Sequence, residues 1–233
     1  DDAHCISDPR PTHSGGRIEI FDEENLLVSV GDFMFHLAQD KNSIYGKTLL
    51  VNKQGKEYKI FSSGHRNVQG LHVVNKELIF SSEHGNVGGD EINRISFGNN
   101  YGWPNISYST FPDDVRMEIT VKRFNSHKNH FELGYTDPLF AMTPAIGPSE
   151  IHFYNKDNFK YWKNKLVLSS LKAQSLYILS LDENFEKITH MEKIYIGSRI
   201  RDFLFKDNSI YLVLEGRYNN EKDNPNLGKI TIE

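Results

Sequence analysis

The sequence repeats one pattern of short strands four times, and this repeat constrains the fold more than any other feature. Each repeat has two strand-forming segments joined by a polar turn, and these pairs occupy residues 17–32, 70–85, 149–172 and 201–216. A third such segment follows each pair: GKTLLVN, EINRISF, SLYILSL and GKITIE. Apolar and polar residues alternate over these short runs, which predicts half-buried β-strands. Long amphipathic helical periodicity is absent, so the sequence predicts an all-β chain.

The spacing of the repeats indicates how the strands are grouped. They begin about 50 residues apart, except that the middle interval is lengthened by an insertion at residues 105–138. About four strands per unit with this period is typical of a β-propeller blade, whereas solenoid repeats are shorter and mostly helical. A β-sandwich also uses short alternating strands, but it gives no reason for the unit to recur. The sequence therefore predicts a partial β-propeller over residues 1–233, with about four blades.

Composition narrows the class of partner. The 233 residues are 25% charged and 38% hydrophobic, ordinary values for a globular chain with a sizeable core. The net charge of −4 removes the electrostatic reason to expect nucleic acid or an anionic membrane surface. No apolar run approaches the roughly 20 residues of a membrane span, and the first residues lack the pattern of a signal peptide. The single cysteine, Cys5, excludes an internal disulfide and leaves the redox compartment open.

Blade geometry predicts which polar segments meet. In an up-and-down blade, the segment before the first strand and the segment after the second lie at the same end of the sheet. These segments hold the unusual polar residues of the chain: His13, Asp32, Arg66, Glu83, Lys172, Arg199 and Arg201. Arg and Lys bind anionic or oxygen-rich ligands, and His serves as a general base near neutral pH. The pattern favours a ligand site at one mouth of the channel; surface ion pairs and a turn-forming His13 remain the alternatives.

A second polar stretch is EHGNVGGDEIN, residues 83–93. Its glycines allow backbone carbonyls to turn inward, and Asp90 and Glu91 add hard oxygen ligands. Calcium prefers this combination of donors. The alternative is a glycine-rich turn capped by an aspartate.

Four motifs occur in a fixed order along the chain: SGHRNVQGL (63–71), EHGNVGGDEIN (83–93), NNYGWPN (99–105) and SRIRDF (198–203). Together they resemble the soluble PQQ-dependent glucose/sorbosone (aldose sugar) dehydrogenases, which are six-bladed β-propellers. THSGGRI, VGD, IGPS and SLK fit the same pattern, so the resemblance covers nearly the whole chain outside residues 105–138.

The resemblance implies an oxidoreductase with a sugar substrate. It would oxidise the C1 hydroxyl of aldose sugars by hydride transfer to pyrroloquinoline quinone (PQQ), assisted by calcium, and would pass electrons to an external acceptor. The resemblance also implies that the protein is secreted and acts in the periplasm or outside the cell.

The resemblance also implies a role for individual residues. His13 matches the catalytic base, Asp32 the acid that supports it, and Arg66 the residue that polarises the reactive quinone carbonyl. The residues implied in cofactor binding are Arg66, Asn67, Lys172, Arg199 and Arg201. Two calcium sites are implied, one at the backbone carbonyls of Gly85 and Asn86 and one at Glu91 and Tyr101.

The chain departs from the family pattern near this site. Thr143 stands where a tryptophan is usual, and Ala145 replaces a hydroxyl residue. Leu37 stands about where a glutamine meets the sugar, although Gln39 is close by. Loss of the aromatic side chain removes a flat wall that stacks on a planar ring and excludes water.

The length of the chain leaves the propeller ring incomplete. A six-bladed ring needs two more repeats, which are expected before this chain or supplied by association. The last segment, GKITIE, would leave an open strand edge.

Two other functions are alternatives to the enzyme. The main one is a non-catalytic propeller that binds protein or carbohydrate, as in hedgehog-interacting-type members. The insertion carries basic residues that suit such a role: Lys122, Arg123, His127, Lys128 and His130. A calcium-dependent lactonase-type hydrolase is a third reading, which the cationic mouth disfavours.

Overall fold

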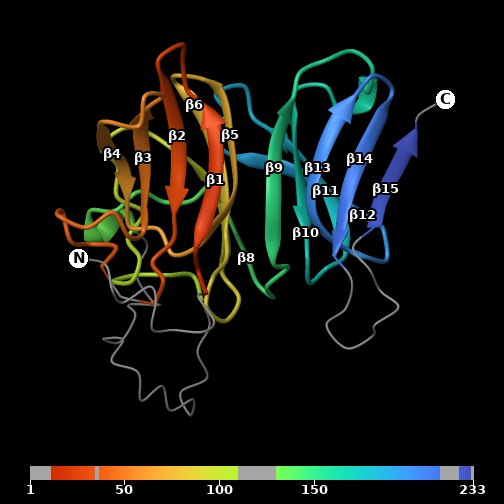
Figure 1. The fold of residues 1–233 in the computed structure, drawn as a ribbon. Coiled ribbons are helices and arrows are strands. Elements are labelled where there is room, and N and C mark those ends of the chain that lie inside the picture. The colour runs from red at the N-terminus through yellow and green to blue at the C-terminus, as the bar shows by residue number, and fades with distance from the viewer. Residues whose placement is uncertain (1–11, 35–36, 110–129, 216–225, 232–233) are drawn as a thin grey trace. The chain divides into compact units, whose positions relative to one another are not determined.

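The computed structural model describes residues 12–34, 37–109, 130–215 and 226–231 as antiparallel β-sheets with two short 3-10 helices (Figure 1). The chain divides into two compact units. Unit 1 holds the described residues up to Val68 together with Ser96–Ser107 and residues 130–137. Unit 2 holds Gln69–Ile95, residues 108–109 and the described residues from Pro138 onward. No helix in these ranges is long and apolar enough to cross a membrane.

Unit 1 contains one four-stranded sheet. Its strands pair in chain order: β1 (Gly15–Ile20), β2 (Asn25–Val30), β3 (Lys47–Asn52) and β4 (Tyr58–Ser63). Asp22 shapes the first hairpin, because its carboxylate accepts hydrogen bonds from the backbone N–H groups of Glu24 and Asn25. Such a side-chain-to-backbone turn is the usual role of Asp between strands. The 3-10 helix η1 (Phe131–Leu133) also belongs to this unit.

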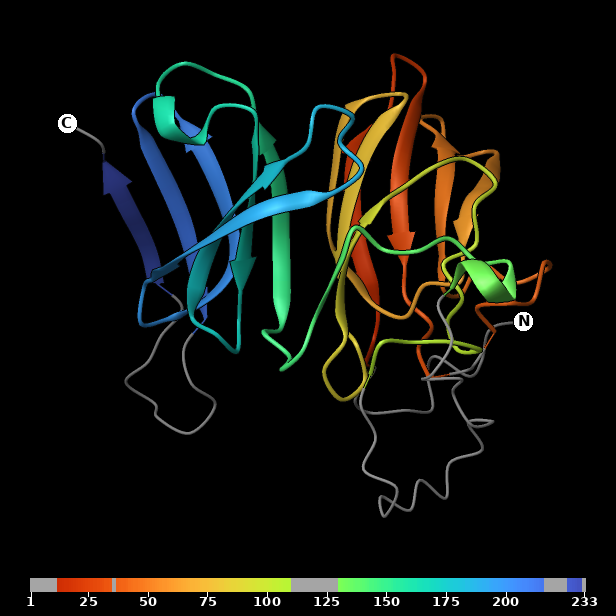
Figure 2. The same ribbon diagram turned by 180° about the vertical axis from the view of Figure 1, so that it is seen from behind.

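Unit 2 contains the other three sheets. The first consists of β5 (Val68–Asn75), β6 (Leu78–Glu83), β7 (Asp90–Arg94) and β8 (Phe140–Met142), with Val68 itself assigned to unit 1. The second consists of β9 (Pro148–Tyr154), β10 (Lys165–Ser170), β11 (Ser175–Leu181) and β12 (Ile188–Tyr195), with η2 (Lys160–Trp162) between β9 and β10. The long outer strand β12 is seen best from behind (Figure 2).

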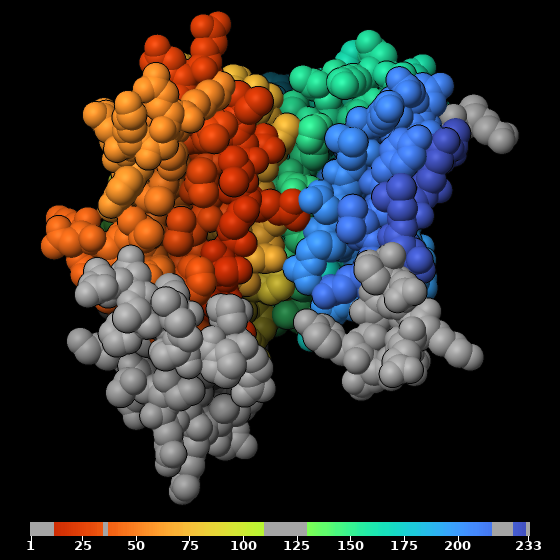
Figure 3. Space-filling view, viewed as in Figure 1, coloured from red at the N-terminus to blue at the C-terminus, as the bar shows by residue number. Residues whose placement is uncertain are grey.

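The last sheet has three strands within the described residues: β13 (Arg199–Lys206), β14 (Ser209–Glu215) and β15 (Asn226–Thr231). Figure 3 shows its outer surface in blue. The predicted strand pairs and third strands are confirmed in all four repeats. The fourth strands β4, β8 and β12 complete the first three sheets. Cys5, Lys122, Arg123, His127 and Lys128 lie outside the described residues.

The core of unit 2 lies between its sheets. On β10, Leu166 and Leu168 pack into a cluster shared with the β5–β8 sheet, whereas Val167 packs into a cluster shared with the β13–β15 sheet. Successive side chains of a strand point to opposite faces, so one strand supplies both clusters. Each fully buried side chain of this size contributes about 1.5–3 kcal/mol relative to exposure. Burial on both faces explains why three consecutive residues of β10, Leu166–Leu168, are apolar.

Candidate active site

The three predicted catalytic residues meet at one end of the unit 1 sheet. His13 precedes β1, Asp32 follows β2, and Arg66 lies between β4 and β5. Antiparallel pairing of β1 with β2 brings the first two together, and the Asp32 N–H donates to the Arg66 carbonyl at 2.8 Å. Gly31 makes the approach feasible, because a Cβ there would lie 1.6 Å from the His13 carbonyl oxygen.

His13 is held between a carboxylate and a guanidinium. Its Nδ1 lies 3.0 Å from Asp32 Oδ1, and its Nε2 lies 2.8 Å from Nη2 of Arg66. Because arginine can only donate, Nε2 must accept, and the ring proton therefore sits on Nδ1 and is donated to Asp32. The side chain of His13 is 19% exposed and that of Asp32 is 1% exposed. The arrangement fixes one tautomer, in which Nε2 carries the lone pair and is the basic atom of the ring.

The Asp32 carboxylate is buried and still ionised. Burial is the largest single influence and raises its pKa, but the hydrogen bonds from His13, the Met34 N–H and Trp103, together with the electrostatic attraction of the His13 ring, outweigh it. The pKa of Asp32 therefore lies below its usual value of 3.8. A carboxylate in this state can stabilise an imidazolium that forms beside it.

Trp103 completes the cluster, and no role was predicted for it from the sequence. Its indole N–H donates to Asp32 Oδ2 at 2.5 Å, and its ring lies under the Arg66 guanidinium at 5.3 Å from ring centroid to guanidinium carbon. A single side chain thus fixes both the acid and the cation. Trp103 lies in NNYGWPN, one of the four motifs that carry the family resemblance, and this position could have identified it as a site residue.

The remaining polar residues of SGHRNVQGL divide into site and scaffold. Asn67 is buried, and its Oδ1 accepts from the Gly15 N–H at 3.2 Å, beside the His13 turn. His65 is fully buried, with Nε2 2.8 Å from Ser62 Oγ and its ring stacked on Tyr101. His65 therefore belongs to the scaffold of unit 1, whereas Arg66 is part of the cluster and Asn67 borders it.

The predicted cofactor cations Arg199 and Arg201 meet in unit 2. Both donate to Glu215 Oε2, at 3.1 Å from Arg199 Nη2 and 2.9 Å from Arg201 Nη2. Arg201 Nη1 also donates to Gln69 Oε1 at 3.2 Å. Two guanidiniums share one carboxylate, so the group carries one net positive charge. Lys172 lies exposed in the β10–β11 connection of the same unit.

The predicted calcium loop is closely braced by Asp90. One oxygen of its carboxylate accepts from the Gly85 N–H at 2.9 Å, and the other accepts from the Ile146 and Gly147 N–H groups at 2.7 and 2.8 Å. The Asn86 N–H donates to Ser109 Oγ at 2.9 Å. Asp90 thus shapes the loop through three backbone bonds, which is the turn-bracing alternative rather than a ligand role for this residue.

The other predicted calcium residues lie in different units. Glu91 is buried in unit 2, with Oε2 3.4 Å from Asn93 Nδ2. Tyr101 is buried in unit 1, and its hydroxyl accepts from the Ser96 N–H at 3.1 Å. Among the described residues, no group of three His, Cys, Asp or Glu side chains is gathered in the manner of a metal site.

Thr143, a departure from the family pattern, and Gln39, the glutamine near Leu37, both make structural hydrogen bonds. Thr143 is exposed, and its Oγ1 accepts from the Gly89 N–H at 3.1 Å in unit 2. In unit 1, the Gln39 side chain donates from Nε2 to Asn100 Oδ1 at 3.1 Å and to the Trp103 carbonyl at 2.6 Å. Gln39 therefore holds the backbone of Trp103 in place.

Residues 6–221 match the model of the Glucose / Sorbosone dehydrogenase family. The chain belongs to this family. Aldose sugar dehydrogenase YliI of Escherichia coli (strain K12) is 31% identical over 212 residues, which cover 82% of this chain and 53% of that protein. The chain thus spans about half the length of the curated relatives it matches.

Solved structures of glucose/sorbosone dehydrogenase relatives share the fold. The soluble aldose sugar dehydrogenase of Escherichia coli in its apo-form aligns with a TM-score of 0.72 at 28% identity, over 86% of this chain and 60% of that one. The PQQ-bound aldose sugar dehydrogenase of Streptomyces coelicolor aligns with a TM-score of 0.71 at 23% identity, over 94% and 62%. The four sheets are accordingly blades of a β-propeller.

Proposed function

We propose that this chain carries part of the site of a PQQ-dependent aldose dehydrogenase that oxidises the C1 hydroxyl of the sugar. The observation that carries the proposal is the cluster of His13, Asp32 and Arg66 in a chain of the glucose/sorbosone dehydrogenase family. Electrons would pass to an external acceptor, and the protein would act in the periplasm or outside the cell, as the family resemblance implies.

His13 supplies the proton chemistry in this proposal. Its Nε2 takes the proton of the C1 hydroxyl, and Asp32 stabilises the resulting imidazolium through the Nδ1–H bond. Arg66 Nη2 donates to the same Nε2, so the arginine bond and the hydroxyl proton compete for one lone pair. Arg66 must therefore turn its N–H toward another acceptor as the sugar proton is taken. A quinone carbonyl is the acceptor that the resemblance implies.

The donor set suits a planar polycarboxylate such as PQQ. Arg199 and Arg201 share one carboxylate and keep a net positive charge, and their side chains are 30% and 40% exposed. Guanidinium groups match carboxylates in a fork geometry. The residues proposed to hold the cofactor are Arg66, Asn67, Lys172, Arg199 and Arg201. When bound, PQQ would accept the hydride from the sugar C1 carbon.

Calcium is proposed at the glycine-rich loop. Gly85 and Asn86 would offer backbone carbonyls, and Glu91 and Tyr101 would serve a second site. The loop has no room for a side chain at Gly85, because a Cβ there would lie 2.1 Å from the Gly88 carbonyl oxygen. Carbonyl oxygens exposed by such tight turns are ligands that calcium accepts.

Reconstitution tests this function directly. The chain is incubated with PQQ and Ca²⁺, the quinone spectrum is recorded, and dye reduction is followed with a panel of aldoses. We expect a saturable quinone spectrum and sugar-dependent reduction of the dye. No turnover and no bound quinone at high protein concentration would overturn the proposal.

One observation favours a second candidate, a propeller that binds protein or carbohydrate without catalysis. The position of the usual tryptophan is held by Thr143, which is exposed and engaged with Gly89, so this wall against a planar cofactor is missing. The reconstitution distinguishes the two candidates, because a binding module takes up no quinone. If the chain is a PQQ-dependent dehydrogenase, the substitution Thr143→Trp should tighten PQQ binding.

A further inference from the structure

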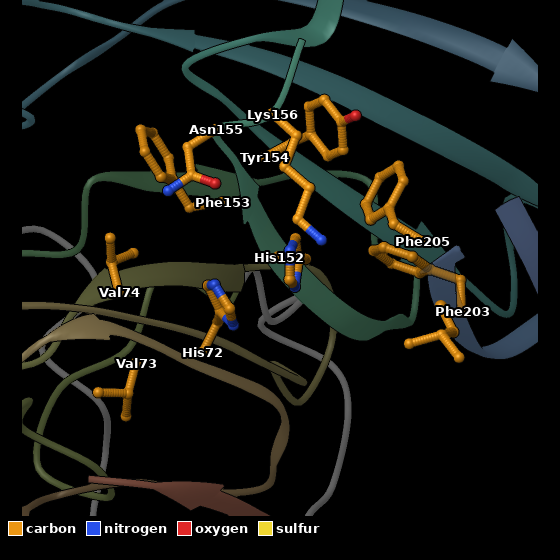
Figure 4. Close-up of a pocket in the computed structure, with 11 residues that line it drawn as sticks. His72, Val73, Val74, His152, Phe153, Tyr154, Asn155, Lys156, Phe203 and Phe205 are labelled. Atoms are coloured by element: carbon orange, nitrogen blue, oxygen red, sulfur yellow. The ribbon is translucent and has the colours of Figure 1, made fainter. Parts of the chain in front are cut away.

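A cavity of about 370 Å³ lies in unit 2 (Figure 4). It is lined by the first strands of three successive sheets, β5, β9 and β13, together with the two residues that follow β9. The volume is within the range of small-ligand sites, roughly 300–1,000 Å³. Nothing in the proposed sugar chemistry uses these side chains.

The walls combine aromatic rings with nitrogen atoms. His72 and His152 face each other with ring centroids 3.9 Å apart and planes tilted by 38°. The His152 ring also contacts Phe205, with centroids 5.3 Å apart. Figure 4 shows the Lys156 amine reaching toward the His152 ring, with Phe203 and Phe205 on the same side. One end of the cavity is therefore cationic and the adjoining wall is flat and aromatic.

The electrostatics of the cavity disfavour cations. Burial, followed by the positive charges of His72 and Lys156, lowers the pKa of His152 to about 3. His152 is consequently neutral near pH 7, while Lys156 supplies a positive charge. An incoming cation would be repelled by that charge, and an incoming anion would be attracted.

A metal ion is a poorer occupant than an anion. The two imidazoles lie tilted face over face, so their in-plane lone pairs do not converge on one point. No third His, Cys, Asp or Glu gathers with them among the residues that the structure describes. A ligand that stacks on the rings and presents negative charge to Lys156 would contact both the aromatic wall and the cationic end of the cavity.

We propose that this cavity binds a planar aromatic carboxylate. The carboxylate would accept hydrogen bonds from Lys156 Nζ and from an imidazole N–H of the histidine pair. The aromatic ring would pack against Phe203, Phe205 and His152. The site is separate from the proposed sugar chemistry, and its test needs neither PQQ nor turnover.

Benzoate is the probe, and its binding to the chain is measured by calorimetry and by NMR of labelled histidine side chains. We expect saturable binding, with a shift of the His72 and His152 signals. Lys156→Met should weaken binding roughly tenfold or more, since a hydrogen bond to a charged group is worth about 1.5–3 kcal/mol. Lys160→Met is the matched control, because Lys160 is an exposed lysine on the same connection that does not line the cavity.

Two related probes separate charge from shape. Benzamide keeps the planar ring without the charge, and cyclohexanecarboxylate keeps the charge without the planar ring. Both should bind more weakly than benzoate. The pKa of His152 should rise when benzoate is bound, because the anion stabilises the imidazolium.

Several results would overturn the inference. These are a Kd for benzoate that Lys156→Met leaves unchanged, benzamide or cyclohexanecarboxylate binding as tightly as benzoate, and no saturable signal up to about 10 mM. The wild-type histidine signals report binding by themselves, so the test does not depend on whether a variant folds.

Discussion

Two histidines of this chain occupy different electrostatic surroundings. In unit 1, His13 lies 3.0 Å from the carboxylate of Asp32 and 2.8 Å from the guanidinium of Arg66, and these two contacts fix its tautomer. In unit 2, His152 lies against His72 and near Lys156, and burial together with these charges keeps it neutral. The same side chain is thus held between two charged groups in one unit and kept neutral among other rings in the other. The difference comes from neighbours supplied by other segments.

The largest expected effect comes from removing the base. His13→Gln should lower kcat for aldose oxidation by about 10²–10⁴-fold, the usual contribution of a general base. Bound PQQ should keep its spectrum, because His13 is proposed to act on the sugar. The measurement is dye reduction by the reconstituted chain. His190→Gln, at an exposed histidine on β12, is the control, and equal losses in both variants would contradict the role of His13.

Asp32→Asn should give the next largest effect. The amide N–H of asparagine would donate to His13 Nδ1, so the ring proton would move to Nε2 and the base would be blocked. We expect a loss of about 10²-fold in kcat or more at neutral pH. Steady-state rates across pH would check this. Unchanged rates would mean that Asp32 only supports the fold.

The lowered pKa of Asp32 also predicts how the free energy of unfolding changes at low pH. Its folded pKa lies below 3.8, so the ionised carboxylate stabilises the fold above about pH 4, and this stabilisation is lost as pH falls through the folded pKa. Denaturant unfolding of wild type and Asp32→Asn below pH 4 should therefore converge.

His152→Phe should change stability in a different pH window. The folded pKa is about 3 and the ordinary value 6.5, so the unfolded chain binds more protons between these limits. Wild-type stability should fall as pH drops from 6.5 toward 3, by at most about 1.4 kcal/mol per pH unit from this group. The variant should lack that part of the slope in urea unfolding. An identical slope would show that His152 is solvated and titrates normally.

The smallest effect is expected at the edge of the cavity. Lys156→Met removes one of the charges that oppose protonation of His152, so the pKa of His152 should rise by less than about one unit. An NMR titration of the histidine ring measures it. Lys160→Met should leave the titration unchanged. A fall in the pKa would contradict the assigned charge effect.

Local patterns predicted much of the fold and part of the site. The alternating segments at residues 17–32 and 201–216 became hairpins β1–β2 and β13–β14 because strand periodicity and turn residues are encoded within a few positions. His13, Asp32 and Arg66 were placed together because blade topology puts their segments at one end of a sheet. Trp103 was not assigned a role, since its partner Asp32 lies 71 residues away in sequence.

The sequence by itself determined the strand repeat, the glycines that permit close turns, and the polar residues at the strand ends. Only the tertiary structure decided how those residues are paired. Lys47 is an example: lysine is normally exposed, but here it is buried, with Nζ donating to the carbonyls of Leu37, Ala38 and Tyr45. Secondary structure follows from neighbours along the chain, whereas burial, charge and tautomer depend on groups that folding brings together. For this reason His13 and His152 cannot be told apart until the chain is folded.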